Sequence, residues 1–222
     1  MAVRSSVRGV GTRGAVSRAA ALAAQSAASG RRFLLGVTGP PGAGKSTLAS
    51  ALVRRVNQRC GPGSVVAVPM DGFHLAQAEL VRLRRADRKG AQDTFDAAGF
   101  VALLRRLRDR GDDVVYAPAF RRELEEPIAC AVPVPREVPL VVVEGNYLLL
   151  DLGAWAGVRP LLDECWYVDV DDGRRVAELV ARHVKHGRSP DAASEWVNRS
   201  DEANARLVAA ARSRADLLVR RS

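Results

Sequence analysis

Short apolar runs alternate along the chain with longer segments of helical periodicity. The apolar runs predict strands at 33–37, 64–70, 113–118, 140–144, 165–170 and 215–219. The segments between them predict helices at about 46–59, 75–86, 97–110, 173–186 and 190–212. Strands that alternate with helices are typical of right-handed βαβ connections and a parallel sheet. The pattern therefore predicts an α/β fold, and it shows no internal repeat and no linker.

The pattern lapses between residues 117 and 139, where five prolines stand in a segment without a clear period. Such a segment is too long for a plain connection. It is either an insertion on the substrate side or an irregular excursion over the surface. We favour the insertion, because loops at the ligand-binding edge of an α/β sheet commonly carry specificity.

Composition fits one compact domain. The chain has 222 residues, of which 47% are hydrophobic, 27% charged and 5% aromatic. Its net charge is +9, but residues 1–70 hold ten Lys or Arg and no acid, whereas 71–222 are nearly balanced. Because the excess is local and lacks interleaved aromatic residues, a nucleic-acid partner is not expected.

Residues 1–30 are rich in Arg, Ser and Ala and contain no acidic residue. The composition has a superficial likeness to a transit peptide, but alanine-rich segments form helices whatever their address. We therefore predict a basic N-terminal extension with a helix at about 15–28, outside the core, followed by a single domain over 31–222.

Three cysteines, Cys60, Cys130 and Cys165, are widely spaced and form no CxxC pair. Neither a zinc site nor a disulfide framework is indicated, and a reducing, cytoplasmic setting fits. No run of the sequence approaches the roughly 18 apolar residues of a membrane span, so no membrane association is expected.

The strongest chemical signal is a glycine-rich motif between the first predicted strand and the helix that follows it. Its residues satisfy the pattern G-x-x-x-x-G-K-[ST], and they are Gly39, Pro40, Pro41, Gly42, Ala43, Gly44, Lys45, Ser46 and Thr47. In such a loop backbone N–H groups and a helix N-terminus face the phosphates. Lys45 is then expected to reach the β- and γ-phosphates of a nucleotide, and the Ser46 hydroxyl to bind Mg²⁺.

Two acidic residues stand at the carboxyl ends of predicted strands. Asp71 ends the strand at 64–70 and Glu144 ends the strand at 140–144. The carboxyl ends of parallel strands line the ligand crevice, so both side chains should lie near the nucleotide. One carboxylate can accept the proton of an attacking hydroxyl while the other orients Mg²⁺. The alternative is that each acid merely caps the next helix.

A basic helical segment follows the fifth predicted strand. Arg175, Arg182 and Lys185 share one helix face, and Gly187 ends the helix so that Arg188 stands on a turn. Arginines on a mobile lid over about 174–190 would neutralise charge on a transferring phosphoryl group while water is excluded. The alternative interpretation is an ordinary solvated charged face.

Taken in order, the motifs GPPGAGKST, MDGFH, VVVEGNYLLL and HGRS resemble those of the phosphoribulokinase/uridine kinase family and its pantothenate kinase relatives. The chain also resembles bacterial proteins labelled nucleoside/nucleotide kinase or fructose transport system kinase. The resemblance covers roughly residues 30–220. It implies a P-loop NTPase three-layer sandwich with a mostly parallel sheet and a small helical lid, ATP and Mg²⁺ as cofactors, a small-molecule substrate, and possible homodimers.

The resemblance also implies roles for individual residues. Asp71 becomes the catalytic base, Glu144 stands at the position that helps to bind the metal and substrate, and Arg182 and Arg188 belong to the lid. The acceptor pocket is implied to contain His74, Arg88, Asp93, Phe95, Tyr116 and Phe120. The region of Asp201 and Asn204 is implied to line the adenine side.

One position departs from the family. Relatives commonly have an acid after the aromatic residue of the segment APAF, where this chain has Arg121. The change would favour an anionic acceptor, or it indicates a surface position. The motif DGFH is nearer to the pantothenate kinase and phosphoribulokinase forms, which makes uridine itself a less favoured acceptor.

Two other P-loop functions compete with a small-molecule kinase. Residues 198–201 (NRSD) have some likeness to the guanine-reading box of GTPases, but that box should follow a strand and these residues fall in a predicted helix. An ATPase coupled to a protein partner is the second competitor. A small domain with a lid is better suited to excluding water from ATP, so we favour the kinase.

Overall fold

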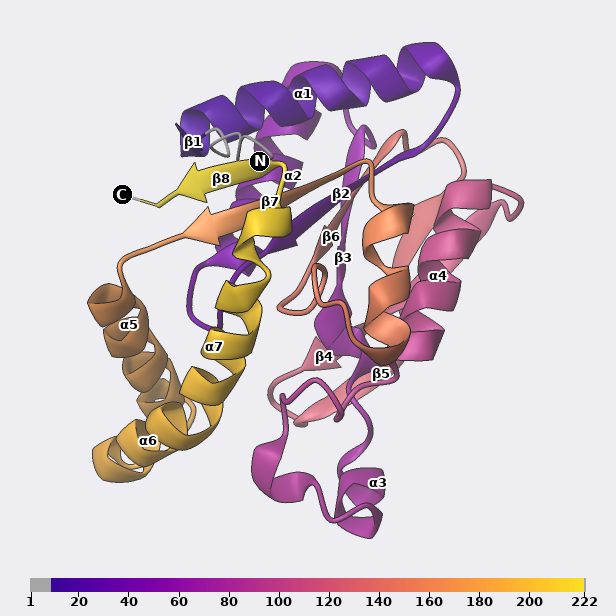
Figure 1. The fold of residues 1–222 in the computed structure, drawn as a ribbon. Helices are drawn as coiled ribbons and strands as arrows, with labels where there is room; N and C mark the ends of the chain where they lie inside the picture. Colours follow the sequence, from indigo (N-terminus) through magenta and orange to yellow (C-terminus); the bar gives the residue numbers. More distant parts are fainter. Residues whose placement is uncertain (1–8, 222) are drawn as a thin grey trace, which may run out of the picture.

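A parallel six-stranded sheet forms the centre of the protein (Figure 1). The computed structural model describes residues 9–221. The strand order is β1 (Gly9–Gly11), β8 (Leu217–Arg220), β7 (Glu164–Asp169), β2 (Phe33–Thr38), β6 (Leu140–Glu144) and β3 (Val65–Pro69). All five neighbouring pairs are parallel, as the alternation of strands and helices predicts.

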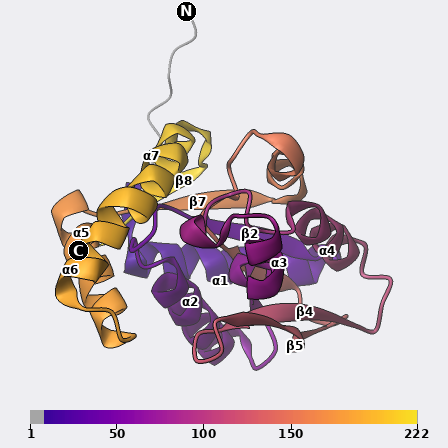
Figure 2. The ribbon, with the colours of Figure 1, turned by 90° about the horizontal axis from the view of Figure 1, so that it is seen from below.

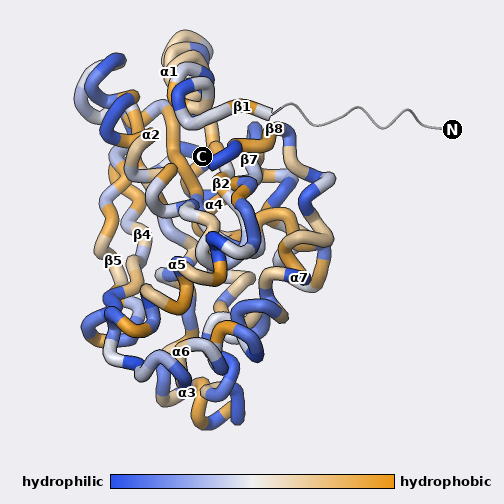
Figure 3. The backbone as a smooth tube through the Cα atoms, turned by 90° about the vertical axis from the view of Figure 1, so that its left-hand side faces the viewer, coloured by the Kyte–Doolittle hydropathy of each residue, from blue (hydrophilic) through white to orange (hydrophobic). Residues whose placement is uncertain are grey.

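Helices cover both faces of this sheet. On one face α1 (Thr12–Ser29) and α2 (Lys45–Cys60) pack against alternate residues of β2, β6 and β7. The opposite face is covered by α4 (Ala97–Asp109), by α7 (Glu202–Ala210) and by the segment around Trp155. Because both faces are covered, every residue of β2 and β6 is buried, and apolar residues dominate the centre of the molecule (Figure 3).

The N-terminal segment belongs to the core, so the expectation that it lies outside is wrong for residues 9–30. Ala15 and Ala19 of α1 are fully buried in the cluster that holds α2, and β1 extends the sheet beside β8. Small alanine side chains let α1 approach α2 closely. Arg18 is on the outer side and pairs with Glu164. Arg4 and Arg8 fall outside the described residues.

A separate two-stranded ribbon replaces one predicted strand of the sheet. The run at 113–118 forms β4 (Val114–Arg121), which pairs antiparallel with β5 (Glu126–Pro135), and neither strand joins the parallel sheet. Within the segment expected to be irregular, residues 117–121 thus belong to β4 and residues 126–135 to β5. Each strand of a two-stranded ribbon has a free edge, which tolerates the missing N–H groups of its prolines, and a register shift occurs between Ala117 and Ala119.

Helices α5 (Asp172–Lys185) and α6 (Pro190–Trp196) follow β7 and form a lid over one end of the sheet. A π-helical turn (Val197–Asp201) then leads into α7, so the single helix expected at 190–212 is interrupted. The helix expected at 75–86 is shorter, α3 (Gln77–Arg82). Figure 2 shows α5 and α6 on one side of the molecule, with α3 and the β4–β5 ribbon on the other.

Candidate active site

The glycine-rich motif forms a tight loop between β2 and α2. Gly42 and Gly44 have φ angles of 80° and 87°, which L side chains rarely adopt. A Cβ atom on Gly42 would lie 2.6 Å from Leu179 Cγ and 2.9 Å from the Arg175 carbonyl oxygen. The lid helix α5 therefore packs directly on the loop, and the N-terminus of α2 points its free N–H groups into the cavity above.

Lys45 begins α2 and is almost fully buried. Its Nζ atom donates to the carbonyl oxygen of Pro40 over 3.0 Å. Burial lowers the pKa of Lys45 to about 8, although the nearby carboxylates of Glu144 and Asp71 oppose the shift. A lysine amine that is shielded from water beside a phosphate loop is suited to bind phosphate, because the bound anion favours the charged form of the amine.

Ser46 and Glu144 meet across the loop. The Ser46 hydroxyl donates to Glu144 Oε1 over 3.1 Å. Burial, followed by the negative charge of Asp71, raises the pKa of Glu144 to about 7. Magnesium in kinase sites takes one or two protein oxygens and completes its shell with phosphates and water. A hydroxyl and a carboxylate at this distance fit that requirement.

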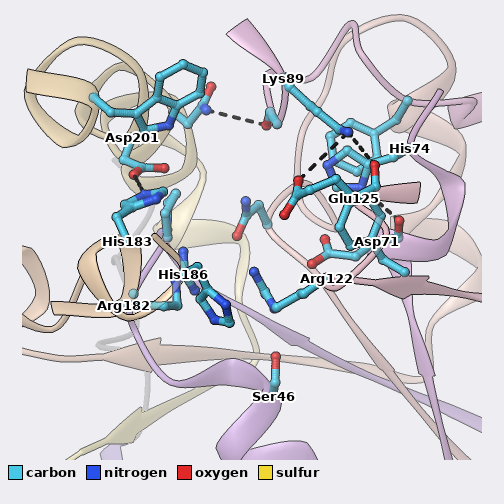
Figure 4. Close-up of a pocket in the computed structure, with 18 of the residues that line it drawn as sticks. Ser46, Asp71, His74, Lys89, Arg122, Glu125, Arg182, His183, His186 and Asp201 are labelled. Atoms are coloured by element: carbon cyan, nitrogen blue, oxygen red, sulfur yellow. Dashed lines mark hydrogen bonds and ion pairs between the residues drawn. The ribbon is translucent and has the colours of Figure 1, made fainter. Parts of the chain in front are cut away.

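A cavity of about 740 Å³ opens above these residues and contains both predicted acids. Asp71 follows β3 in a short 3₁₀ turn, and Pro69 is in register with Glu144 at the ends of β3 and β6. The adjacent strand ends bring Asp71 and Glu144 to the same cavity as Lys45 and Ser46. The two acids thus share a cavity with the phosphate loop, as predicted, and Figure 4 shows Asp71 and Ser46 in this cavity.

The lid supplies the opposite wall. Arg182 and Arg188 both line the cavity, and the Arg188 guanidinium lies 4.1 Å from the centre of the Trp196 ring. Burial lowers the pKa of Arg182. His183 Nε2 is 2.9 Å from Asp201 Oδ2, which joins α5 to the π-helical turn. Residues 198–201 therefore lie within a helix and not after a strand, which argues against a guanine-reading box.

Arg175 does not share the position of Arg182 in the cavity. Its side chain is 2% exposed and pairs with Asp172 and Glu202 at 2.9 and 2.6 Å. The sequence predicts one shared helix face for the two arginines, but they lie in different surroundings. Arg175 packs against α7 in the protein interior, whereas Arg182 lines the cavity.

The far end of the cavity is aromatic and polar. The His74 ring contacts the Phe95 and Phe120 rings in tilted arrangements, with centroids 4.0 and 4.8 Å away. His74 Nδ1 is 2.7 Å from the backbone carbonyl oxygen of Asp71, and burial lowers the pKa of His74. Lys89 Nζ lies 5.3 Å from the centre of the Phe120 ring. Three of the residues implied for the acceptor pocket thus line this end.

The other three residues implied for the acceptor pocket do not line this cavity. Arg88 and Asp93 pair with each other at 2.6 Å and border a separate hollow beside Arg199 and Asn204. Tyr116 is 52% exposed. The neighbours of Tyr116 in β4, Val115 and Ala117, point inward, so the alternation of the strand turns the tyrosine to the outside.

Several residues of the cavity were not predicted from the sequence. They are Gln77, Arg122, Glu125, Glu126, Asn146 and Trp196. Arg122 and Glu125 come from the turn between β4 and β5, and Glu126 begins β5; the prolines of this segment hide the hairpin from pattern analysis. Arg121 is exposed and does not line the cavity, whereas its neighbour Arg122 does.

Comparison with known proteins places the chain in a family. Residues 34–222 match the model of the phosphoribulokinase / uridine kinase family. The chain belongs to this family. A candidate uridine kinase of Schizosaccharomyces pombe is 34% identical over 184 residues, which cover 80% of this chain and 78% of that protein. The Escherichia coli protein YggC is 30% identical over 85% of this chain and 78% of its own length.

Solved structures agree with this assignment. The crystal structure of a candidate fructose transport system kinase from Silicibacter sp. TM1040 has a TM-score of 0.79 and 36% identity, over 90% of this chain and 98% of that one. YFH7 from Saccharomyces cerevisiae shares the fold, with a TM-score of 0.79 at 17% identity over 96% of this chain and 99% of that one. The protein is therefore a P-loop kinase of the phosphoribulokinase/uridine kinase family, in which ATP and a divalent metal serve the reaction. Among the described residues no helix is both long and apolar enough to span a bilayer.

Proposed function

We propose that the protein transfers the γ-phosphoryl group of ATP, bound with Mg²⁺, to a hydroxyl of a small metabolite of the sugar, nucleoside or pantothenate class. The observation that carries the proposal is the position of Asp71. This carboxylate shares one cavity with Lys45 and Ser46, and the space beyond it leads to the aromatic end at His74. A carboxylate between a phosphate loop and a second binding space is placed to accept the proton of an attacking hydroxyl.

The residues around the phosphate loop then have defined roles in the reaction. The loop N–H groups and Lys45 hold the β- and γ-phosphates, and Ser46 with Glu144 would hold the metal, which neutralises charge on the phosphates. Arg182 and Arg188 provide positive charge from the lid. The reaction breaks the bond between the γ-phosphorus and the bridging oxygen of ADP, forms a bond to the acceptor oxygen, and leaves the acceptor proton on Asp71.

The names of the relatives support a small acceptor without choosing one. One similar protein is named for uridine and a solved structure is named for a fructose transport system, while more distant relatives are pantothenate kinases. The far end of the cavity offers hydrogen-bonding groups from Gln77, Lys89 and Glu126 beside an aromatic wall. Such a mixture suits a hydroxylated metabolite.

The test is ADP release from Mg·ATP in the presence of fructose and other sugars, ribonucleosides, pantothenate and sugar phosphates. We expect one class to stimulate turnover well above the basal rate. Asp71→Asn should lower the stimulated kcat by roughly 10²- to 10⁴-fold with ATP affinity retained, as for loss of a general base.

The control is Asp113→Asn, which removes a carboxylate whose side chain is 94% exposed and which should leave turnover unchanged. Absence of stimulation by every class contradicts the proposal and favours an ATPase that acts with a protein partner. A loss of Mg·ATP binding in Asp71→Asn would instead assign this residue to the metal.

A further inference from the structure

Two arginines approach the centre of the cavity from opposite walls. Arg182 belongs to the lid helix α5, and Arg122 belongs to the turn between β4 and β5. In Figure 4 Arg122 and Arg182 lie on opposite sides of the space above Ser46, with His186 between them in this view. The turn that carries Arg122 is thus a second wall over the phosphate loop, independent of the lid.

Neither guanidinium group has a partner among residues 9–221. No hydrogen bond or ion pair involves the side chain of Arg122 or of Arg182 in this part of the chain, whereas Arg175 and Arg88 are each held by carboxylates. Lys89, the other cation at the acceptor end, donates to Gln77 Oε1 and to the backbone carbonyl of Glu125. Arg188, the third arginine of the cavity, lies over the Trp196 ring, so among the described residues Arg122 and Arg182 are the cavity arginines with neither a hydrogen bond, an ion pair nor an aromatic partner.

The charge of Arg122 changes the pKa of groups on the other sides of the cavity. Burial lowers the pKa of Arg182, and the positive charge of Arg122 adds to this shift. The same charge of Arg122 opposes the rise in the pKa of Glu144 at the phosphate loop. Arg122 thus lies within electrostatic range of both the lid and the metal-binding side of the cavity.

Arg122 is exposed and Arg182 is half-buried, and two like charges that face each other across a cavity are stabilised by an anion bound between them. The phosphate loop and Lys45 already provide for the β- and γ-phosphates in the bound nucleotide. The additional anion at the centre is the phosphoryl group as it leaves the loop, when charge spreads over its three oxygens. Guanidinium groups are suited to this task, since their planar forks donate to two oxygens at once.

We propose that Arg122 is a catalytic residue that, together with Arg182, binds the phosphoryl group in transit from ATP to the acceptor. This inference rests on the proposed function. Arg122 stays protonated throughout: it stabilises the group between the breaking bond to ADP and the forming bond to the acceptor, while the acceptor proton goes to Asp71. The β4–β5 turn is then part of the catalytic machinery and not only of acceptor recognition.

The chain supplies a matched control for this proposal in the preceding residue. Arg121 is an exposed arginine of the same hairpin and does not line the cavity. Arg122→Gln should lower kcat on the order of 10²-fold with the KM for ATP little changed, as expected for the loss of one donor to the transition state. Arg122→Lys should restore only part of the rate, because it keeps the charge and loses the fork. Arg121→Gln should behave as the wild type.

A binding measurement makes the test independent of the acceptor. Mg·ADP with aluminium fluoride mimics the phosphoryl group in transit, and titration calorimetry can compare its affinity with that of Mg·ADP alone. We expect aluminium fluoride to tighten ADP binding in the wild type and in Arg121→Gln, and to lose most of this effect in Arg122→Gln, whose affinity for ADP alone should be unchanged.

Two outcomes overturn the proposal. In the first, Arg122→Gln matches Arg121→Gln in both measurements. In the second, it raises only the KM for the acceptor and keeps the aluminium fluoride effect, which assigns Arg122 to acceptor binding. Failure of the proposed function is distinguishable from both, since it would leave the wild type without acceptor-stimulated turnover whatever Arg122 does.

Discussion

Arg175 of the lid helix α5 donates to Glu202 of α7 over 2.6 Å, from a side chain that is 2% exposed. The same guanidinium lies 3.4 Å from the carbonyl oxygen of Pro41 in the phosphate loop. One buried arginine thereby joins the beginning of the lid, the helix that follows the lid and the loop that binds phosphate. The lid is anchored at this end, so any movement must occur toward Arg188 and α6.

Arg175→Ala should lower the free energy of unfolding by about 1 to 3 kcal/mol, because it removes a buried side chain and leaves Glu202, which is 26% exposed, without its cation. Urea denaturation followed by circular dichroism measures the change. The control is Arg174→Ala at the preceding residue of α5. The Arg174 side chain is 45% exposed and pairs with Glu178, so this substitution should change stability by less than about 1 kcal/mol. Equal effects of the two substitutions would show that the buried pair does not anchor the lid.

The sheet could be predicted from the sequence because each of its central strands is a continuous apolar run. β2, β6 and β7 are buried on both faces, and only apolar runs satisfy that environment. The β4–β5 ribbon could not be predicted in the same way. Its prolines obscure strand periodicity, and whether the run at 113–118 joins the main sheet depends on tertiary pairing that no local pattern encodes.

The site shows the same division between local and long-range information. Lys45 and Ser46 stand within one contiguous motif, and Asp71 and Glu144 stand at strand ends, so all four could be placed from the sequence. Tyr116 could not, because its direction depends on the register of β4. The roles of all these residues stay predictions until the variants are measured.

The packing of α1 can be tested by a substitution that overfills its buried face. Ala19 is fully buried between α1 and the sheet, and Ala19→Leu should destabilise the protein by about 1 to 3 kcal/mol. Ala21→Leu adds the same side chain on the exposed face of the same helix and should change stability by less than about 0.5 kcal/mol. Thermal unfolding of both variants provides the comparison. If Ala19→Leu is as stable as Ala21→Leu, α1 is not packed as described.

Position 42 requires glycine for two reasons: its φ angle is positive, and the lid helix α5 leaves no space for a side chain. Gly42→Ala places a Cβ at φ 80°, 2.6 Å from Leu179 Cγ, and must displace α5. Gly63→Ala is the matched control, since Gly63 has φ 78° and no atom within 4 Å of the added Cβ. The control should lose only about 1 to 2 kcal/mol of stability from backbone strain.

Gly42→Ala should lose more stability than this control and should bind ATP at least roughly tenfold more weakly, which corresponds to about 1.4 kcal/mol. Calorimetric unfolding and nucleotide titration measure the two effects. Equal losses in the two variants would mean that strain alone matters and that the contact with α5 does not.

The lowered pKa of Lys45 predicts that ATP binding takes up a proton in mildly alkaline solution. In the free protein burial lowers this pKa to about 8, so the amine is mostly neutral at about pH 9. Bound phosphates favour the charged form and raise the pKa again, so affinity should be constant below pH 8 and should fall as pH rises above it. Titration calorimetry at about pH 9, in two buffers of different ionisation enthalpy, should find uptake of most of one proton per ATP. Lys45→Arg keeps its charge at this pH and should show none, whereas binding without proton uptake in the wild type would mean that Lys45 is already charged in the free protein.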